Sequence, residues 1–177
     1  MKTKNLILGL FLMMGIGVFA QHAKDKKLIK DAATAKAAFI EKDNGMNHFF
    51  NDAKAYVIFP NVGKGAFVVG AASGNGIVYE NGVVVGSAKM KKLDVGLQAG
   101  GKAFSEIIFF EDADAYNSFK DDDFEFTGNV SAVMLKSGAS AEAKYRDGVA
   151  VFANPKAGLM AELSVGGQKF DYSPITK

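Results

Sequence analysis

The chain has 177 residues, with 21 basic side chains, 19 acidic side chains and no cysteine. Its first 20 residues contain two of the lysines and no acid, so residues 21–177 carry equal numbers of basic and acidic groups. A neutral domain excludes a general electrostatic attraction to nucleic acid, and any anion-binding surface must therefore be local. Without disulfides, the fold must be stabilised by burial of apolar side chains.

The first 20 residues have the pattern of a signal peptide. Lys2 and Lys4 precede an apolar run, Leu6–Phe19, that is short for a membrane span, and small or modest side chains stand before Gln21. Because no cysteine lies near this point, we exclude a lipoprotein. We expect an exported bacterial protein, periplasmic or associated with the cell envelope. The mature residues 21–177 are long enough for one domain with its own core.

The segment Lys24–Glu41 has the pattern of a basic amphipathic helix. Its main apolar positions recur at helical spacing: Leu28, Ala32, Ala35 and Phe39. A basic amphipathic helix can lie on an anionic membrane. The simpler interpretation is that its apolar face covers a sheet, because alanine anchors weakly in a membrane. A further helical segment, Met46–Ala55, is expected to bury Phe49 and Phe50.

Most of the remaining chain has the pattern of short strands separated by turns. Asn81-Gly82 is a strong hairpin signal, and the fully apolar run Ile107–Phe110 predicts a central strand covered on both sides. Pro60-Asn61 and Asn154-Pro155 indicate turns. The predicted strands are Tyr56–Phe59, Ala66–Val69, Ile77–Glu80, Val83–Lys89, Lys92–Phe104, Ile107–Phe110, Phe126–Leu135, Ala141–Tyr145, Val149–Ala153, Leu159–Val165 and Lys169–Tyr172.

One helix is inserted among these strands. It covers Glu111–Lys120, with Asp112 as its N-cap, Asp114 in the first turn and Lys120 at the end. No repeat or linker divides the chain. The sequence therefore predicts a single α+β domain with a mostly antiparallel twisted sheet, sandwich-like or barrel-like, an N-terminal amphipathic helix and one inserted helix.

No pattern in the sequence indicates catalysis, a metal site or a cofactor. Gly96–Lys102 has the spacing of a phosphate loop, but Ala103 follows where Ser or Thr is needed, and the segment alternates like a strand. With only two histidines, His22 and His48, and no cysteine, a zinc site or a Ser–His–acid triad lacks its residues. His48, in an apolar helical turn, favours a structural role. We therefore expect a protein that is not an enzyme.

The strongest local signal for binding is basic. Lys89, Lys91 and Lys92 crowd a predicted connection between two strands, and Lys64 lies in a glycine-rich loop whose amides are able to hold a phosphate. A solvated strand end that discourages edge pairing explains the three clustered lysines equally well.

Several motifs, taken in order, resemble the SYLF domain, a lipid-binding module. They are Phe59–Gly65, Gly70 with Gly74-x-Gly76, Val95–Gly100, Ser105–Ile108, Lys156–Ala161 and Leu163–Gly167. The resemblance covers nearly all of residues 21–177. Ala66, Ala157 and Gly167 differ from the residues that are usual at these positions of the motifs.

The resemblance implies a non-enzymatic domain that binds phospholipid. Eukaryotic relatives recognise phosphoinositides, and anionic phospholipid is the nearest equivalent for an exported bacterial protein. The predicted lipid contacts are Lys64, Lys89, Lys91 and Lys92, assisted by Lys26, Lys27 and Lys30 of the helix. The alternative is a structural envelope module whose glycine-rich sheet face receives a partner protein, without specific affinity for lipid.

Overall fold

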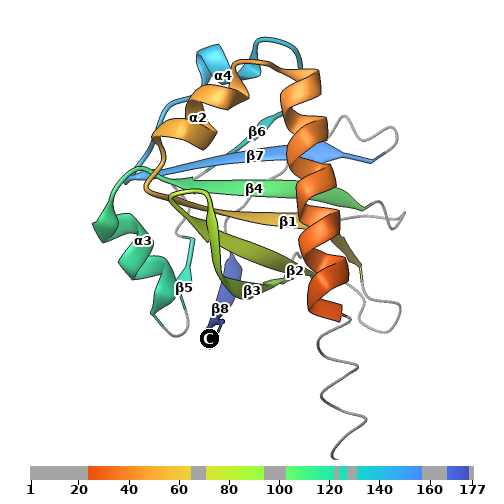
Figure 1. The fold of residues 1–177 in the computed structure, drawn as a ribbon, viewed down its shortest axis with the longest axis vertical. Coiled ribbons are helices and arrows are strands. Elements are labelled where there is room, and N and C mark those ends of the chain that lie inside the picture. Colours follow the sequence, from red (N-terminus) through yellow and green to blue (C-terminus); the bar gives the residue numbers. More distant parts are fainter. Residues whose placement is uncertain are drawn as a thin grey trace, which may run out of the picture.

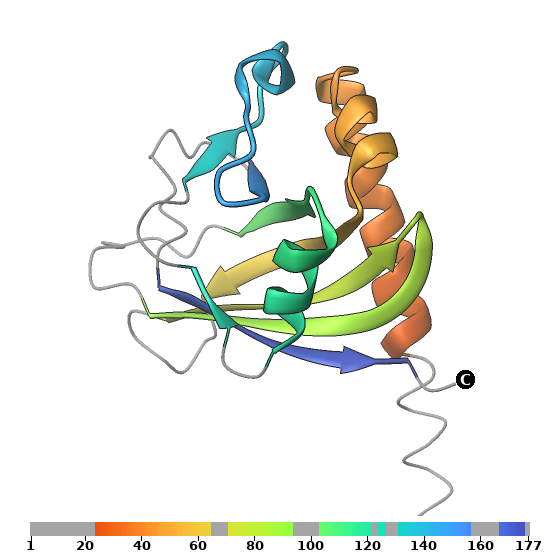
Figure 2. The ribbon, with the colours of Figure 1, turned by 90° about the vertical axis from the view of Figure 1, so that its left-hand side faces the viewer.

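Over the residues that the structure describes, the backbone forms one eight-stranded sheet with helices packed against it (Figure 1). This computed structural model describes residues 24–64, 71–93, 103–121, 124–126, 131–156 and 167–175. The predicted α+β class, the mostly antiparallel sheet, the N-terminal helix and the inserted helix are confirmed. The sheet curls like half of a barrel, as Figure 2 shows, so the barrel-like alternative describes it better than a sandwich.

The strands follow the order β5-β8-β3-β2-β1-β4-β7-β6 across the sheet. All neighbouring pairs are antiparallel except β6 and β7, which are parallel. The bounds are β1 Ala55–Lys64, β2 Ala71–Glu80, β3 Val83–Leu93, β4 Phe104–Phe110, β5 Phe124–Glu125, β6 Ala132–Met134, β7 Val149–Pro155 and β8 Gln168–Pro174. The predicted central strand is confirmed, because every residue of β4 is buried.

The outer face of the sheet is covered by the N-terminal helix (residues 24–42) and by α2 (Met46–Asp52). In Figure 1 the N-terminal helix crosses the strands at a steep angle. Its buried residues Ala32, Ala35 and Phe39 share one core cluster with Phe49 and Phe50 of α2. The small alanines let the helix approach the strands closely. The interpretation that the apolar face of this helix covers the sheet is therefore correct.

The inner face of the curl holds a second core cluster. The helix α3 (Ala113–Lys120) contributes Tyr116 and Phe119, and β8 contributes Phe170. Asp112 caps this helix as predicted, because its Oδ1 accepts a hydrogen bond from the Ala115 N–H at 2.9 Å. One polar pair lies in the same interior, where Gln168 Nε2 donates to Glu106 Oε2 at 3.1 Å.

The predicted hairpin between β2 and β3 is confirmed. Asn81 and Gly82 have φ angles of 50° and 76°, which is the left-handed pair that a tight two-residue hairpin requires. However, β2 begins at Ala71, earlier than predicted. Gly74 and Gly76 therefore lie inside the strand. Both positions need glycine, because a Cβ at Gly74 would come within 2.9 Å of Val62 and one at Gly76 within 2.8 Å of the Phe59 ring.

Two predicted features are wrong. Pro60-Asn61 makes no turn between strands, since β1 continues through it to Lys64 with a bulge. Ala141–Tyr145 is no strand, because Ala139–Glu142 forms the helix α4. Its alternating alanines suggested a strand, but alanine and glutamate favour helix when a tertiary contact fixes the start of the turn. That contact is a hydrogen bond from the Ser140 N–H to Asp43 Oδ2 at 2.7 Å.

Other predicted strands are found in part or lie outside the described residues. Of the predicted strand Phe126–Leu135, the structure describes residues 126 and 131–135, in which β6 is a short strand at one edge of the sheet. The short strand β5 at the other edge ends just before this segment. Ala66–Val69, Leu159–Val165 and most of Lys92–Phe104, with its phosphate-loop-like spacing, lie outside the described residues.

Candidate functional site: a groove between the N-terminal helix and the sheet

Two adjoining hollows lie where one side of the N-terminal helix meets the sheet. Their volumes are about 540 and about 470 Å³, and both are lined by Lys27 and Asp31. We call them together the helix groove. The smaller hollow, named the basic end, is also lined by Lys24, Leu28, Asn75, Ser87 and Lys89. The larger hollow, named the amide end, is also lined by Thr34, Asn61, Ser105, Asn154 and Lys156.

A single stripe of the helix forms one wall of the groove. The lining positions are 24, 25, 27, 28, 31, 34, 35 and 38. Residues three or four apart lie on the same side of a helix, so these positions follow one line along its length. The stripe is charged at the start, where Lys24 and Lys27 stand, and small at the end, where Ala35 and Ala38 leave space beside the strands.

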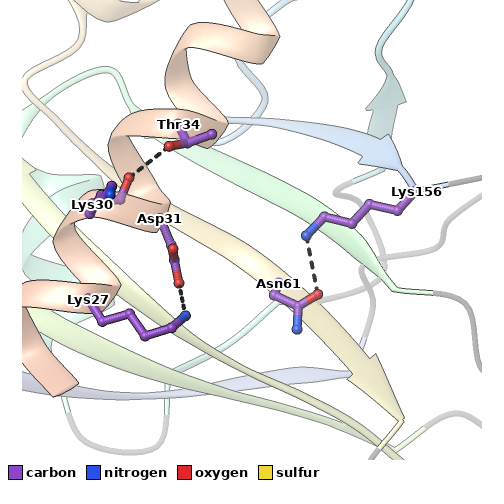
Figure 3. A network of polar contacts seen from close by, with 6 residues as sticks. All are labelled: Lys27, Lys30, Asp31, Thr34, Asn61 and Lys156. Carbon is purple, nitrogen blue, oxygen red and sulfur yellow. Dashed lines mark hydrogen bonds and ion pairs between the residues drawn. The ribbon is translucent and has the colours of Figure 1, made fainter.

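At the basic end, two cations from distant parts of the sequence line one hollow. Lys27 comes from the helix, and Lys89 comes from β3, where it pairs across to Asn75 of β2. The Nζ of Lys27 also bonds Asp31 Oδ2 at 2.6 Å, in an exposed ion pair (Figure 3). Such a pair contributes little to folding and leaves both groups accessible to a ligand.

A bulge in β1 forms the floor of the amide end. From Ile58 to Val62 the register advances four residues on β1, but only three on β2, from Ile77 to Gly74. Strict alternation from the buried Phe59 would place Asn61 in the inner core. The extra residue gives that place to Val62 and turns Asn61 to the groove side, which is a common use of a bulge beside a functional site.

Amide and hydroxyl side chains from three adjacent strands meet at this floor. Ser105 of β4 pairs in register with Asn154 of β7 and lies beside the bulge of β1. Lys156 Nζ donates to Asn61 Oδ1 at 3.3 Å, as Figure 3 shows. Lys42 Nζ donates to Asn154 Oδ1 at 3.0 Å. Lysines therefore fix the orientation of both amides through their oxygens.

The N-terminal helix is also anchored by a half-buried lysine. Lys36 Nζ donates to the Tyr56 hydroxyl at 3.1 Å and lies 4.3 Å from the centre of the Phe50 ring. Burial lowers the pKa of Lys36 and raises the pKa of Tyr56. The turn that ends the helix is held by Asp43. Burial raises the pKa of this carboxyl, but hydrogen bonds from Ser140, Gly45 and Gly138 outweigh that effect and leave it lowered.

The structure brings together only part of the predicted lysine set. Lys27 and Lys89 meet at the basic end, and exposed Lys91 pairs with Asp171 at 3.4 Å. The predicted position of Lys89, Lys91 and Lys92 in a connection is wrong, because all three belong to β3. Lys26 and Lys30 are exposed and line neither hollow of the groove. The side chains of Lys64 and Lys92 lie outside the described residues.

The sequence prediction missed the groove residues Lys24, Asn61, Asn75, Asn154 and Lys156. Asn61 and Asn154 each stand beside a proline, which favours the interpretation as a turn. Asn154-Pro155 in fact ends β7. No local signal distinguishes such an asparagine from a turn residue, because its function depends on strands far apart in sequence.

Two further features of the described residues are the spacing of their possible metal ligands and the surroundings of His48. Within the described ranges, no three His, Cys, Asp or Glu side chains gather closely enough to hold a metal ion. His48 is exposed, and its Nδ1 lies 2.7 Å from Asp52. The described helices also include none with the length and apolar character needed to cross a bilayer.

Comparison with known proteins finds a distant relative. The chain is 28% identical over 141 residues to Beta cell expansion factor A of Aeromonas veronii. The match covers 78% of this chain and 53% of the relative, so the chain spans about half the length of that protein. No protein-family model matches the chain.

Proposed function

We propose that the protein is a non-enzymatic lipid-binding protein of the bacterial cell envelope that binds anionic phospholipid headgroups at the basic end of the helix groove. The observation that carries the proposal is the convergence of Lys27 and Lys89, 62 positions apart in the sequence, on one hollow. Lys24 adds a third cation to the same lining.

The composition of the basic end suits a phosphodiester. Three lysines outnumber the two carboxylates, Asp25 and Asp31, so the lining has an excess of one positive charge. A phosphodiester headgroup such as that of phosphatidylglycerol carries one negative charge. Asn75 and Ser87 add polar groups that are able to donate hydrogen bonds to phosphate oxygens.

The sequence resemblance to the SYLF domain supports the same class of ligand, and we assign the chain to that group as part of this proposal. The similarity to Beta cell expansion factor A is compatible with a bacterial member of the group. We keep the expected signal peptide, residues 1–20, and an exported location within the proposal. Lys91 extends the cationic surface along β3, next to Lys89.

The direct test is co-sedimentation of residues 21–177 with vesicles. We expect binding to vesicles that contain anionic phospholipid, weak binding to zwitterionic vesicles, and a loss of binding as salt is raised. Salt shortens the screening length from about 10 Å at 0.1 M to about 3 Å at 1 M, so contacts between lysines and phosphates weaken. Absence of binding to every vesicle would remove the proposed function and favour a module that binds a partner protein.

A further inference from the structure

We infer that the amide end of the helix groove is a subsite for a polyhydroxylated group, so that the preferred ligand is a phosphate ester of a polyol such as the glycerol headgroup of phosphatidylglycerol. This inference rests on the proposed function, because it names the headgroup whose phosphate lies at the basic end. The shared Lys27 and Asp31 make the two ends continuous.

The amide end differs from the basic end in its chemistry. Besides Lys27 and Lys156 it is lined by the Asp31 carboxylate, the amides of Asn61 and Asn154, and hydroxyl groups. The Asp31 carboxylate only accepts hydrogen bonds, so it repels an anionic group and attracts a hydroxyl group. A phosphate or carboxylate would satisfy the lysines of this hollow but would at the same time face the Asp31 carboxylate.

A polyol satisfies both kinds of group. Each hydroxyl both donates and accepts, and a planar amide offers a donor and an acceptor side by side. The oxygens of Asn61 and Asn154 accept bonds from Lys156 and Lys42, so each amide directs its remaining donor, Nδ2, elsewhere. Neither Nδ2 has a partner in the parts of the chain that the structure describes.

Two hydroxyl side chains complete the subsite. Thr34 donates its hydroxyl hydrogen to the Lys30 carbonyl at 3.1 Å (Figure 3). Its Oγ1 is then able to accept a hydrogen bond, and Thr34 lines the amide end. Ser105 belongs to the floor and is 5% exposed. The hollow, about 540 Å³, lies in the range of small-ligand sites, which is about 300–1,000 Å³. It has room for glycerol or a sugar ring.

The experiment compares two lipids of equal charge. Vesicles contain phosphatidylcholine and an equal mole fraction of either phosphatidylglycerol or phosphatidylserine, and binding of residues 21–177 is measured by co-sedimentation. We expect about tenfold tighter binding to phosphatidylglycerol, which corresponds to one or two additional hydrogen bonds. Equal binding to both lipids would overturn the polyol subsite and leave the proposed function intact.

Matched variants locate the effect. The double variant Asn61→Ala/Asn154→Ala keeps the net charge, so it should lose the preference for phosphatidylglycerol while its binding to phosphatidylserine stays the same. Asn117→Ala, an exposed asparagine on α3 away from the groove, should keep the preference. A double variant that retains the preference, or that loses binding to both lipids equally, contradicts the assignment.

The soluble headgroup separates a lipid surface from a free ligand. Glycerophosphoglycerol is titrated into the ¹⁵N-labelled protein, and the side-chain NH₂ signals of Asn61 and Asn154 are followed by NMR. Shifts of these signals support the subsite, even if no vesicle binds and the proposed membrane role fails. Unchanged signals at saturating headgroup overturn it.

Discussion

Removing the two lysines that meet at the basic end should weaken vesicle binding in a predictable way. Each lysine close to an anionic surface contributes about 1 kcal/mol, so Lys27→Ala/Lys89→Ala should lose about 2 kcal/mol, which is roughly 30-fold in affinity. Asp31 already pairs with Lys27 at 2.6 Å, which reduces what this lysine offers a phosphate. The first effect makes the loss of affinity smaller. Removal of Lys27 also leaves the Asp31 carboxylate facing the phosphate, which makes the loss larger, so the two effects oppose each other.

The assay is co-sedimentation with anionic vesicles over a series of salt concentrations. The matched control is Lys136→Ala/Lys144→Ala, which removes the same charge from exposed positions that line neither hollow of the groove. Both variants should unfold like the wild type, because an exposed ion pair contributes at most about 1 kcal/mol. An equal loss in the control would show that net charge, and not the groove, determines binding. A loss that does not shrink at high salt would equally refute the reasoning.

Three further predictions concern the frame that holds the groove, and denaturant unfolding checks each of them. Asp43→Ala should cost about 1–3 kcal/mol, since it leaves the part-buried N–H groups of Gly45 and Ser140 without their acceptor. Because the pKa of Asp43 is lowered, its contribution to stability is complete above the unfolded value of 3.8 and is lost as the pH falls through the folded pKa. The wild type should therefore lose stability in acid that the variant does not lose, and an equal acid loss in both proteins would contradict this. Gly76→Ala should destabilise the fold by about 1–3 kcal/mol, because its Cβ would meet the Phe59 ring at 2.8 Å. The control Gly63→Ala should be tolerated, because its Cβ would lie 3.7 Å from its nearest neighbour. Equal effects of the two substitutions would count against close packing as the reason for Gly76. Tyr145→Phe should be neutral or stabilising by up to about 1 kcal/mol at neutral pH, because the buried hydroxyl has no partner among the described residues. Burial, with the charges of Glu111 and Asp52, raises the pKa of Tyr145 to about 12. The stability of the wild type should therefore fall between pH 10 and 12 by an amount that Tyr145→Phe does not lose. Parallel pH profiles of the two proteins would exclude this tyrosine as the cause.

The sequence by itself determined the elements whose signals are local. The Asn81-Gly82 hairpin needs only two residues with positive φ, and the α3 cap needs only Asp112 and the N–H three residues later. The helical spacing of the apolar residues in the N-terminal helix predicts burial of one face. The continuous apolar run Ile107–Phe110 predicts a strand buried on both faces. Each of these patterns is complete within a few residues of the chain.

The tertiary structure alone decided the shape of the helix groove. Pro60-Asn61 carries the same signal whether it forms a turn or a bulge, and only pairing with β2 and β4 makes it a bulge that directs Asn61 to the groove. Lys27 and Lys89 were both predicted to bind lipid, but helical and strand geometry separate them from Lys26 and Lys30, which stand off the groove. Asn154 and Lys156 come to the site from 93 and 95 positions beyond Asn61. A site assembled from such distant segments depends on strand order and register, which no local pattern encodes.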